Sequence, residues 1–164
     1  MEEWQAEVNR FDALSDAACA GDAPAWATLQ QAAQTDPVAK VAMAWLITTQ
    51  GCAHFSGNEV EAFALNKRAA SYGYPIALSN TGFRLLTGRG THKDTAKGLR
   101  SIERAIRGGH GKAAATLAIH YARGIHLPRD LPAARSHLAT AEAMLVNPTL
   151  LDRAWAAIEA AEGD

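Results

Sequence analysis

The sequence predicts an all-α fold, an α-solenoid of about nine helices arranged as stacked helical hairpins. Three observations favour this class. Alanine is abundant, while the aromatic residues that favour strands make up only 7% of the chain. Small and apolar residues recur at helical spacing through most of the sequence. Related segments also return at a constant interval, which is typical of solenoids.

The repeat is clearest around YARGIHLPRD, residues 121–130. A shift of 36 residues places this segment on LLTGRGTHKD, residues 85–94, and a second shift places it on TQGCAHFSGN, residues 49–58. We therefore expect three full repeats, at residues 40–75, 76–111 and 112–147. Residues 1–39 are expected to form an N-terminal capping helix and a half repeat, and residues 148–164 a C-terminal capping helix, all within one domain over residues 1–164.

Each repeat is predicted to be a hairpin of two helices joined by a loop. In the second repeat, Ala77 and Leu85 share one face of the first helix, and Leu99, Ile102 and Ile106 share one face of the second. Small residues fill matching positions of successive repeats, as they must where two helices approach closely. The final segment, TLLDRAWAAIEAAEGD, keeps its apolar side chains on one face, as a terminal cap should.

Start and stop signals set the ends of the helices. Prolines follow an Asp or Asn by one or two residues at four places, in the order expected where a helix begins: Pro24, Pro37, Pro132 and Pro148. Gly88 lies where the first helix of its repeat should end, so we expect it to adopt a positive φ. The predicted helices run approximately over residues 2–19, 23–34, 37–53, 59–72, 76–88, 95–107, 112–124, 131–145 and 148–162.

The best-conserved copy of the pattern is ATLAIHYARGIHLPRDLPAARSHLATAEA, which extends over residues 115–143. Its Leu117, Tyr121, Gly124, Asp130 and Ala134 occupy positions that resemble those of the Sel-like repeats (SLR), which are helical hairpins related to tetratricopeptide repeats. The copy at 40–75 is degenerate and lacks both loop glycines. The resemblance implies a right-handed superhelix whose first helices line one concave groove. It also implies a protein–protein interaction module that is not an enzyme.

Several functions find no support in the sequence. The formal net charge of -1 gives no electrostatic basis for binding nucleic acid or an anionic membrane. GGHGKAAAT, residues 108–116, lacks the first glycine and the Ser or Thr of a phosphate-binding loop. The histidines lack the spacing of a metal site, and neither cysteine has a partner for nucleophilic catalysis. We therefore expect no catalytic residues, no metal and no cofactor.

The cysteines and the N-terminus favour the cytosol. Cys19 and Cys52 are too few for a disulfide scaffold and lie in different repeat positions, so we expect two reduced thiols that pack as small hydrophobic residues. MEEWQAEVNR does not resemble a signal peptide, and no segment is long and apolar enough to cross a membrane. The expected location is therefore cytoplasmic.

The candidate binding residues are those that the resemblance places on the first helices. One repeat position holds Ile47, Phe83 and Ile119, and this apolar ladder is expected to line the concave groove. The polar and cationic candidates around it are Arg84, His120, Lys112, Arg123 and Gln50. The alternative is that the ladder turns inward and belongs to the core. Three tryptophans are expected to be core residues, namely Trp26, Trp45 and Trp155, while the position of Trp4 stays open.

Two classes of function remain. The first is an adaptor or scaffold that binds a protein or peptide partner, extended or helical and with some acidic character, in its groove. A bacterial immunity or inhibitor protein that blocks a toxin or an enzyme is a more specific form of this class. The second class is an enzyme or regulatory sensor with a buried small-ligand site. We expect a monomer or weak dimer.

Overall fold

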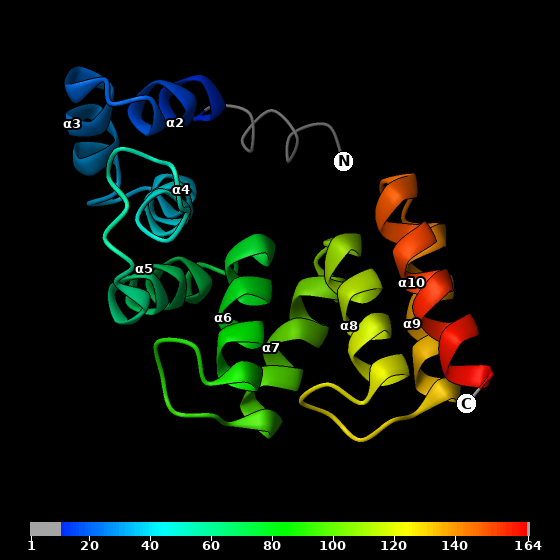
Figure 1. Ribbon diagram of the computed structural model, residues 1–164. Coiled ribbons are helices and arrows are strands. Elements are labelled where there is room, and N and C mark those ends of the chain that lie inside the picture. Colours follow the sequence, from blue (N-terminus) through cyan, green and yellow to red (C-terminus); the bar gives the residue numbers. More distant parts are fainter. Residues whose placement is uncertain (1–10, 164) are drawn as a thin grey trace.

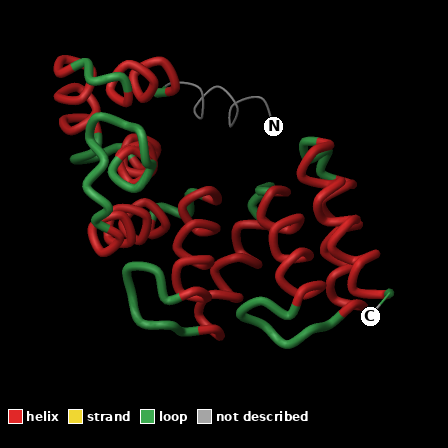
Figure 2. The backbone as a smooth tube through the Cα atoms, in the orientation of Figure 1, coloured by secondary structure: helices red, strands yellow, loops and turns green. Residues whose placement is uncertain are grey.

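A computed structural model describes residues 11–163, and within this range all regular structure is helical (Figures 1 and 2). The all-α prediction is confirmed. The helices are α2 (Asp12–Cys19), α3 (Ala23–Ala32), α4 (Pro37–Leu46), α5 (Glu59–Ser71), α6 (Pro75–Thr87), α7 (Thr95–Arg107), α8 (Gly111–Arg123), α9 (Leu131–Ala143) and α10 (Pro148–Glu162).

The helices pair along the chain as hairpins. α4 packs on α5, α6 on α7 and α8 on α9, while α10 packs on α8 and α9 at the C-terminal end. In Figure 1, α6, α8 and α10 stand side by side, and α4 is viewed nearly along its axis. The first hairpin is therefore turned strongly with respect to the second. Within residues 11–163 no helix is both long and apolar enough to span a bilayer.

The predicted capping signals form in most repeats. The side chains of Asp36, Asn58, Asp94 and Asp130 each accept a hydrogen bond from a backbone N–H in the first turn of the next helix. Gly88 ends α6 with a φ of 77°, which confirms the expected positive φ, and Gly124 ends α8 in the same way with a φ of 65°. The observed ends of α7 and α10 match the prediction.

One helix is much shorter than predicted. α4 was expected to extend to residue 53, but it ends at Leu46. The Ile47 carbonyl accepts the backbone N–H groups of Ser56 and Gly57, so the chain turns into a loop that folds back on the helix end. The C-terminal ends of α3, α5 and α9 differ from the prediction by one or two residues, and α6 and α8 each begin and end one residue earlier than predicted. Residues 2–10 of the first predicted helix lie outside the described range.

The two helices of the second hairpin touch through glycines. A Cβ atom placed on Gly82 of α6 would lie 2.6 Å from Cγ1 of Ile102 and 2.8 Å from the carbonyl oxygen of Gly98. A Cβ atom on Gly98 of α7 would lie 2.9 Å from the carbonyl oxygen of Gly82. The backbones therefore pack against each other with no room for a methyl group.

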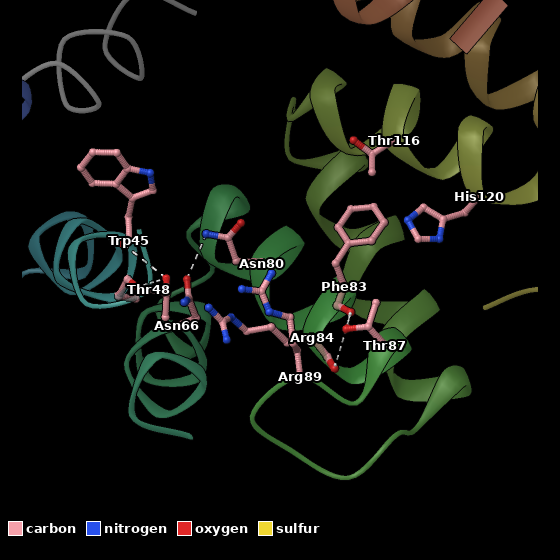
Figure 3. A pocket seen from close by; sticks show the side chains of 11 residues that line it. Trp45, Thr48, Asn66, Asn80, Phe83, Arg84, Thr87, Arg89, Thr116 and His120 are labelled. Carbon is pink, nitrogen blue, oxygen red and sulfur yellow. Dashed lines mark hydrogen bonds between the residues drawn. The ribbon is translucent and has the colours of Figure 1, made fainter. Parts of the chain in front are cut away.

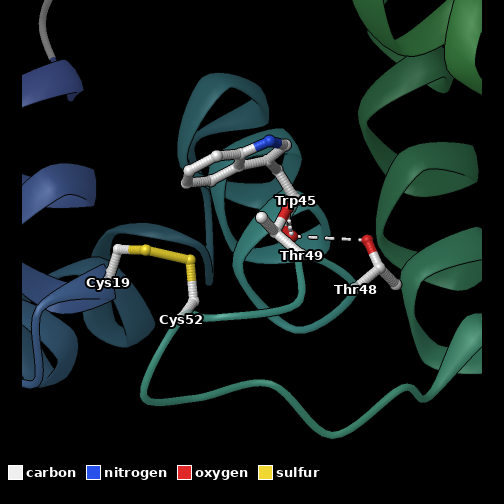
Figure 4. Close-up of a disulfide and its surroundings, with 5 residues drawn as sticks. All are labelled: Cys19, Trp45, Thr48, Thr49 and Cys52. Atoms are coloured by element: carbon white, nitrogen blue, oxygen red, sulfur yellow. Dashed lines mark hydrogen bonds between the residues drawn. A yellow bond between two sulfur atoms is a disulfide. The ribbon is translucent and has the colours of Figure 1, made fainter.

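The cysteines contradict the prediction of reduced thiols. Cys19 and Cys52 form a disulfide with a Cα–Cα distance of 4.3 Å (Figure 4). The prediction was wrong because α4 ends early, and the loop that follows it returns to the end of α2. There the backbone N–H of Ala53 donates a hydrogen bond to the Cys19 carbonyl at 2.8 Å.

The tryptophans divide between core and surface. Trp26 is partly buried and stacks on the ring of His54, with 4.1 Å between ring centroids. Trp155 was expected in the core, but 40% of it is exposed because it projects beside α9, where its Nε1 donates a hydrogen bond to Glu142. Trp45 is also exposed and belongs to the site discussed next. Trp4 lies outside the described residues.

The glycine contact gives a first prediction. Gly82→Ala should lower the free energy of unfolding by about 2 kcal/mol, because the added methyl group has to push the helices apart. In an exposed helix the same change would stabilise the protein by up to ~1 kcal/mol. The sign of the change in unfolding free energy therefore shows whether the two backbones are in contact. Urea denaturation measures the effect, with Ser136→Ala on the exposed face of α9 as the control. A stabilised Gly82→Ala variant would show that the helices are not in backbone contact.

The disulfide gives a second prediction. It joins residues 33 apart in the sequence, so replacing both cysteines by serine should lower the free energy of unfolding by about 3–4 kcal/mol. A reducing agent should destabilise the wild-type protein and leave the doubly substituted variant unchanged. Thermal unfolding with and without the reducing agent measures both effects. Detection of two free thiols in the native, air-oxidised protein would contradict the assignment.

Candidate functional site: a groove along the first helices

The described structure has an open hollow of about 340 Å³ between the first helices of the three hairpins (Figure 3). It lies between α4, α6 and α8, and α5 and the loop after α6 also contribute to its walls. The lining residues are Ala44, Trp45, Thr48, Asn66, Asn80, Phe83, Arg84, Thr87, Arg89, Thr116 and His120.

Two repeat positions supply a regular part of this lining. The first holds Ala44, Asn80 and Thr116, and the second, four residues later, holds Thr48, Arg84 and His120. Residues four apart lie on the same face of a helix, so the two positions form one stripe on α6 and on α8, while in the first hairpin Ala44 lies on α4 and Thr48 in the turn that follows it. The groove is therefore a property of the repeat itself.

The predicted apolar ladder is only partly in the groove. Phe83 lines the hollow, but Ile47 is 4% exposed and packs in a core cluster with Ala44 and Ala62. Ile119 packs against the cluster formed by α8, α9 and α10. The structure therefore places Ile47 and Ile119 against core clusters, because the lining of the hollow is centred on the neighbouring residue, a rotation of about 100° around the helix axis.

Of the remaining candidates, some line the hollow and others lie outside it. Arg84 and His120 line the hollow. Lys112 and Arg123 are exposed at opposite ends of α8 and are not among the lining residues. Gln50 is exposed in the loop after α4, because α4 ends before reaching it.

Trp45 is the main residue that the sequence interpretation missed. It was expected in the core, because its repeat position is an internal one in a helical hairpin. Thr81 and Leu117, which hold this position in the next two repeats, are both buried. Trp45 instead has 47% of its surface exposed. It lies between the groove and a second open hollow of about 460 Å³ that reaches Asp12 and Asp16 of α2, and Asn80 lines both hollows. No sequence signal distinguished Trp45 from a core residue.

A cationic cluster forms one side of the groove. Nη1 of Arg84 donates one hydrogen bond to Oε2 of Glu59 at 2.5 Å and another to the backbone carbonyl oxygen of Glu59 at 3.3 Å. Arg89 donates from Nε and Nη2 to Oε1 of the same carboxylate. Partial burial raises the pKa of the Glu59 carboxyl, but the hydrogen bonds from Arg89 and Arg84 outweigh it and hold the pKa below its usual value. One carboxylate thus faces two guanidinium groups, which leaves a net positive charge.

An aromatic pair forms the other side. The rings of Phe83 and His120 lie 5.4 Å apart, and Nδ1 of His120 is 2.9 Å from the Ile125 carbonyl oxygen. Burial lowers the pKa of His120, the hydrogen bond to Ile125 opposes this effect, and the nearby His126 lowers it further. The lowered pKa favours the neutral form of His120, and the arginines supply the positive charge of the groove.

The described residues contain no group of three His, Cys, Asp or Glu side chains placed to hold a metal ion. The groove offers hydrogen-bonding groups, aromatic surface and positive charge. These groups can form hydrogen bonds, aromatic contacts and ion pairs with a bound molecule.

Comparisons with known proteins identify the fold. No protein-family model and no curated protein matches the chain. Among solved structures, the chain is similar to a Sel1 repeat protein from Oxalobacter formigenes, with 23% identity and a TM-score of 0.63 over 82% of this chain and 53% of that one. It is also similar to a protective antigen present in uropathogenic Escherichia coli strains that displays an SLR fold, with 19% identity and a TM-score of 0.59 over 84% of this chain and 32% of that one.

These similarities define the fold. The chain has the SLR fold, so the resemblance drawn from the sequence is confirmed at the level of the fold. The chain spans about half the length of the Oxalobacter protein and about a third of the Escherichia coli antigen.

The position of Phe83 gives a third prediction. Phe83 is partly buried against the core, so Phe83→Ala should cost about 1–2 kcal/mol of stability, roughly half of what a fully buried Phe costs. Trp45→Ala should change stability by less than ~0.5 kcal/mol, because Trp45 is a surface residue. Chemical denaturation compares both with Leu86→Ala, which removes a fully buried side chain. A loss at Phe83 as large as that at Leu86 would place Phe83 in the core.

Proposed function

We propose that this protein is a non-enzymatic interaction module that binds an acidic segment of a protein partner in the groove between α4, α6 and α8. The observation that carries the proposal is the charge of the groove. Its described lining includes Arg84 and Arg89 but no carboxylate, and the adjacent Glu59 balances only one of the two. An acidic partner would be guided to this site and oriented by it.

Exposed aromatic surface supports the same function. Trp45 and Phe83 lie on opposite sides of the groove (Figure 3). Tryptophan is among the residues that contribute most to binding energy at protein interfaces. Both hollows open to solvent, which suits a macromolecular partner better than an enclosed small ligand. The alternative of an enzyme or a sensor with a buried ligand has no comparable observation in its favour.

The disulfide indicates the compartment in which the protein binds its partner. Disulfides persist in oxidising environments and are rare in the cytosol. Cys19–Cys52 therefore favours a periplasmic or extracellular location over the cytoplasmic one expected from the sequence.

Site-specific photocrosslinking tests the proposed function. A photoreactive phenylalanine analogue replaces Trp45 in the groove or, as a control, Lys97 on the exposed surface of α7. The groove variant should capture a discrete protein that the α7 variant does not. A toxin or a hydrolase among the captured proteins would indicate the immunity or inhibitor form of this function. Equal labelling from both positions would contradict the groove as the binding site.

The charge of the groove gives a further prediction. Arg89→Gln should weaken binding of the captured partner about threefold to tenfold at low ionic strength and much less at high salt. Arg123→Gln removes the same charge from an exposed position outside the hollow, so it should have a smaller effect. Titrations at two salt concentrations measure both. Equal effects of the two substitutions would mean that only the overall charge of the protein matters.

A further inference from the structure

Asn66 is a polar residue in a position that the other two full repeats fill with apolar side chains. The matching residues are Ile102 and Leu138, and both are fully buried. Asn66 is itself only 2% exposed. Burying an amide costs free energy unless its groups are hydrogen-bonded, so an amide in a core position calls for a reason beyond packing.

The hydrogen bonds of Asn66 fix the orientation of a second amide. Its Nδ2 donates to the Ala62 carbonyl oxygen at 2.8 Å. A carbonyl oxygen can only accept, so this bond identifies which end of the Asn66 amide is nitrogen and leaves Oδ1 as the end that faces Asn80. Asn80 must therefore present its own Nδ2, which donates to Oδ1 of Asn66 at 3.0 Å. The buried amide acts as a support that holds Asn80 in one orientation.

The rest of the Asn80 amide faces the groove. Figure 3 shows its oxygen on the side away from Asn66, toward the space between Trp45 and Phe83. Within the described residues, Oδ1 and the second hydrogen of Nδ2 have no partner. The groove therefore offers one oriented acceptor and one donor between two aromatic side chains.

An extended peptide backbone matches this arrangement. In an extended chain the N–H and C=O of one residue point to the same side, so a single residue can donate to Oδ1 and accept from Nδ2. Its neighbouring side chains point alternately to either face, where Trp45 and Phe83 lie. A helical partner lacks this ability, because its backbone groups are already bonded within the helix.

We propose that Asn80 binds the main chain of the partner, and that the partner lies in the groove as an extended strand. This inference rests on the proposed function and specifies the form in which the partner binds. Asn66 is a positioning residue, since it acts through Asn80. Recognition of the main chain holds the strand in place whatever its sequence, and the aromatic and arginine side chains select among sequences.

Backbone-modified peptides test the inference. A random peptide library displayed on phage is selected against the oxidised full-length protein, and a peptide whose binding is lost in Trp45→Ala is synthesised with single N-methyl groups along its backbone. One N-methyl position should weaken binding to the wild-type protein about fivefold to tenfold. The same modification should have no further effect on binding to Asn80→Ala, because the contact is already absent there.

Variants of the supporting residue separate binding from folding. Asn66→Leu introduces the residue that Leu138 provides at the matching position, so the melting temperature should stay the same or rise while affinity for the selected peptide falls. Asn66→Leu with Asn80→Ala removes both amides without leaving one buried and unpaired. The double variant should bind the parent peptide and its N-methylated form equally.

The outcomes that overturn the inference are distinct from those that overturn the function. A Trp45-dependent peptide that tolerates N-methylation at every position, or that is helical when bound, contradicts main-chain recognition and leaves the groove as the binding site. Unchanged affinity in Asn66→Leu contradicts the positioning role. Failure to select any peptide that depends on Trp45 overturns both proposals.

Discussion

Close approach of small residues is the constraint on which the rest of this structure depends. An alanine-rich helix has little side-chain surface to bury, so two such helices gain contact only when their backbones come near each other. Gly82 and Gly98 allow this in the second hairpin, and Ala118 and Ala134 occupy the matching positions in the third. The hairpins are therefore thin, and the larger aromatic and charged side chains are free to project into the groove.

The first hairpin lacks one of these small residues and is held together by other interactions. Leu46 occupies the position of Gly82, and Cys52 occupies the position of the helix-ending Gly88. Without a glycine to end α4 in a tight turn, the chain forms a longer loop, and the disulfide fastens that loop to the end of α2. On its other side, Glu59 joins the hairpin to Arg84 and Arg89 of the next repeat. A covalent bond and an ion cluster thus hold the repeat that has diverged most.

The sequence predicts the fold well because each repeat contains the local signals that determine its helices and turns. Register, capping residues and the positive φ of Gly88 are local signals, and each appears in the structure where it was expected. The site is predicted less well, since periodicity shows which residues are equivalent but not which face of the helix turns inward. A shift of one residue moves Ile47 from the groove to the core. The disulfide and the exposure of Trp45 depend on how α2 and the loop pack, and no other repeat has a counterpart to these contacts.

The functional residues are therefore best sought among departures from the repeat. Residues shared by all units are needed to close hairpins and to stack them, so they carry little information about a partner. Asn66 replaces an apolar core residue, and Trp45 occupies a position that is buried in the other units. A sequence keeps such local inconsistencies where they serve a purpose other than folding. Asn66 and Trp45 converge on one groove together with Asn80 and the two arginines, and this convergence sets the groove apart from the rest of the described surface.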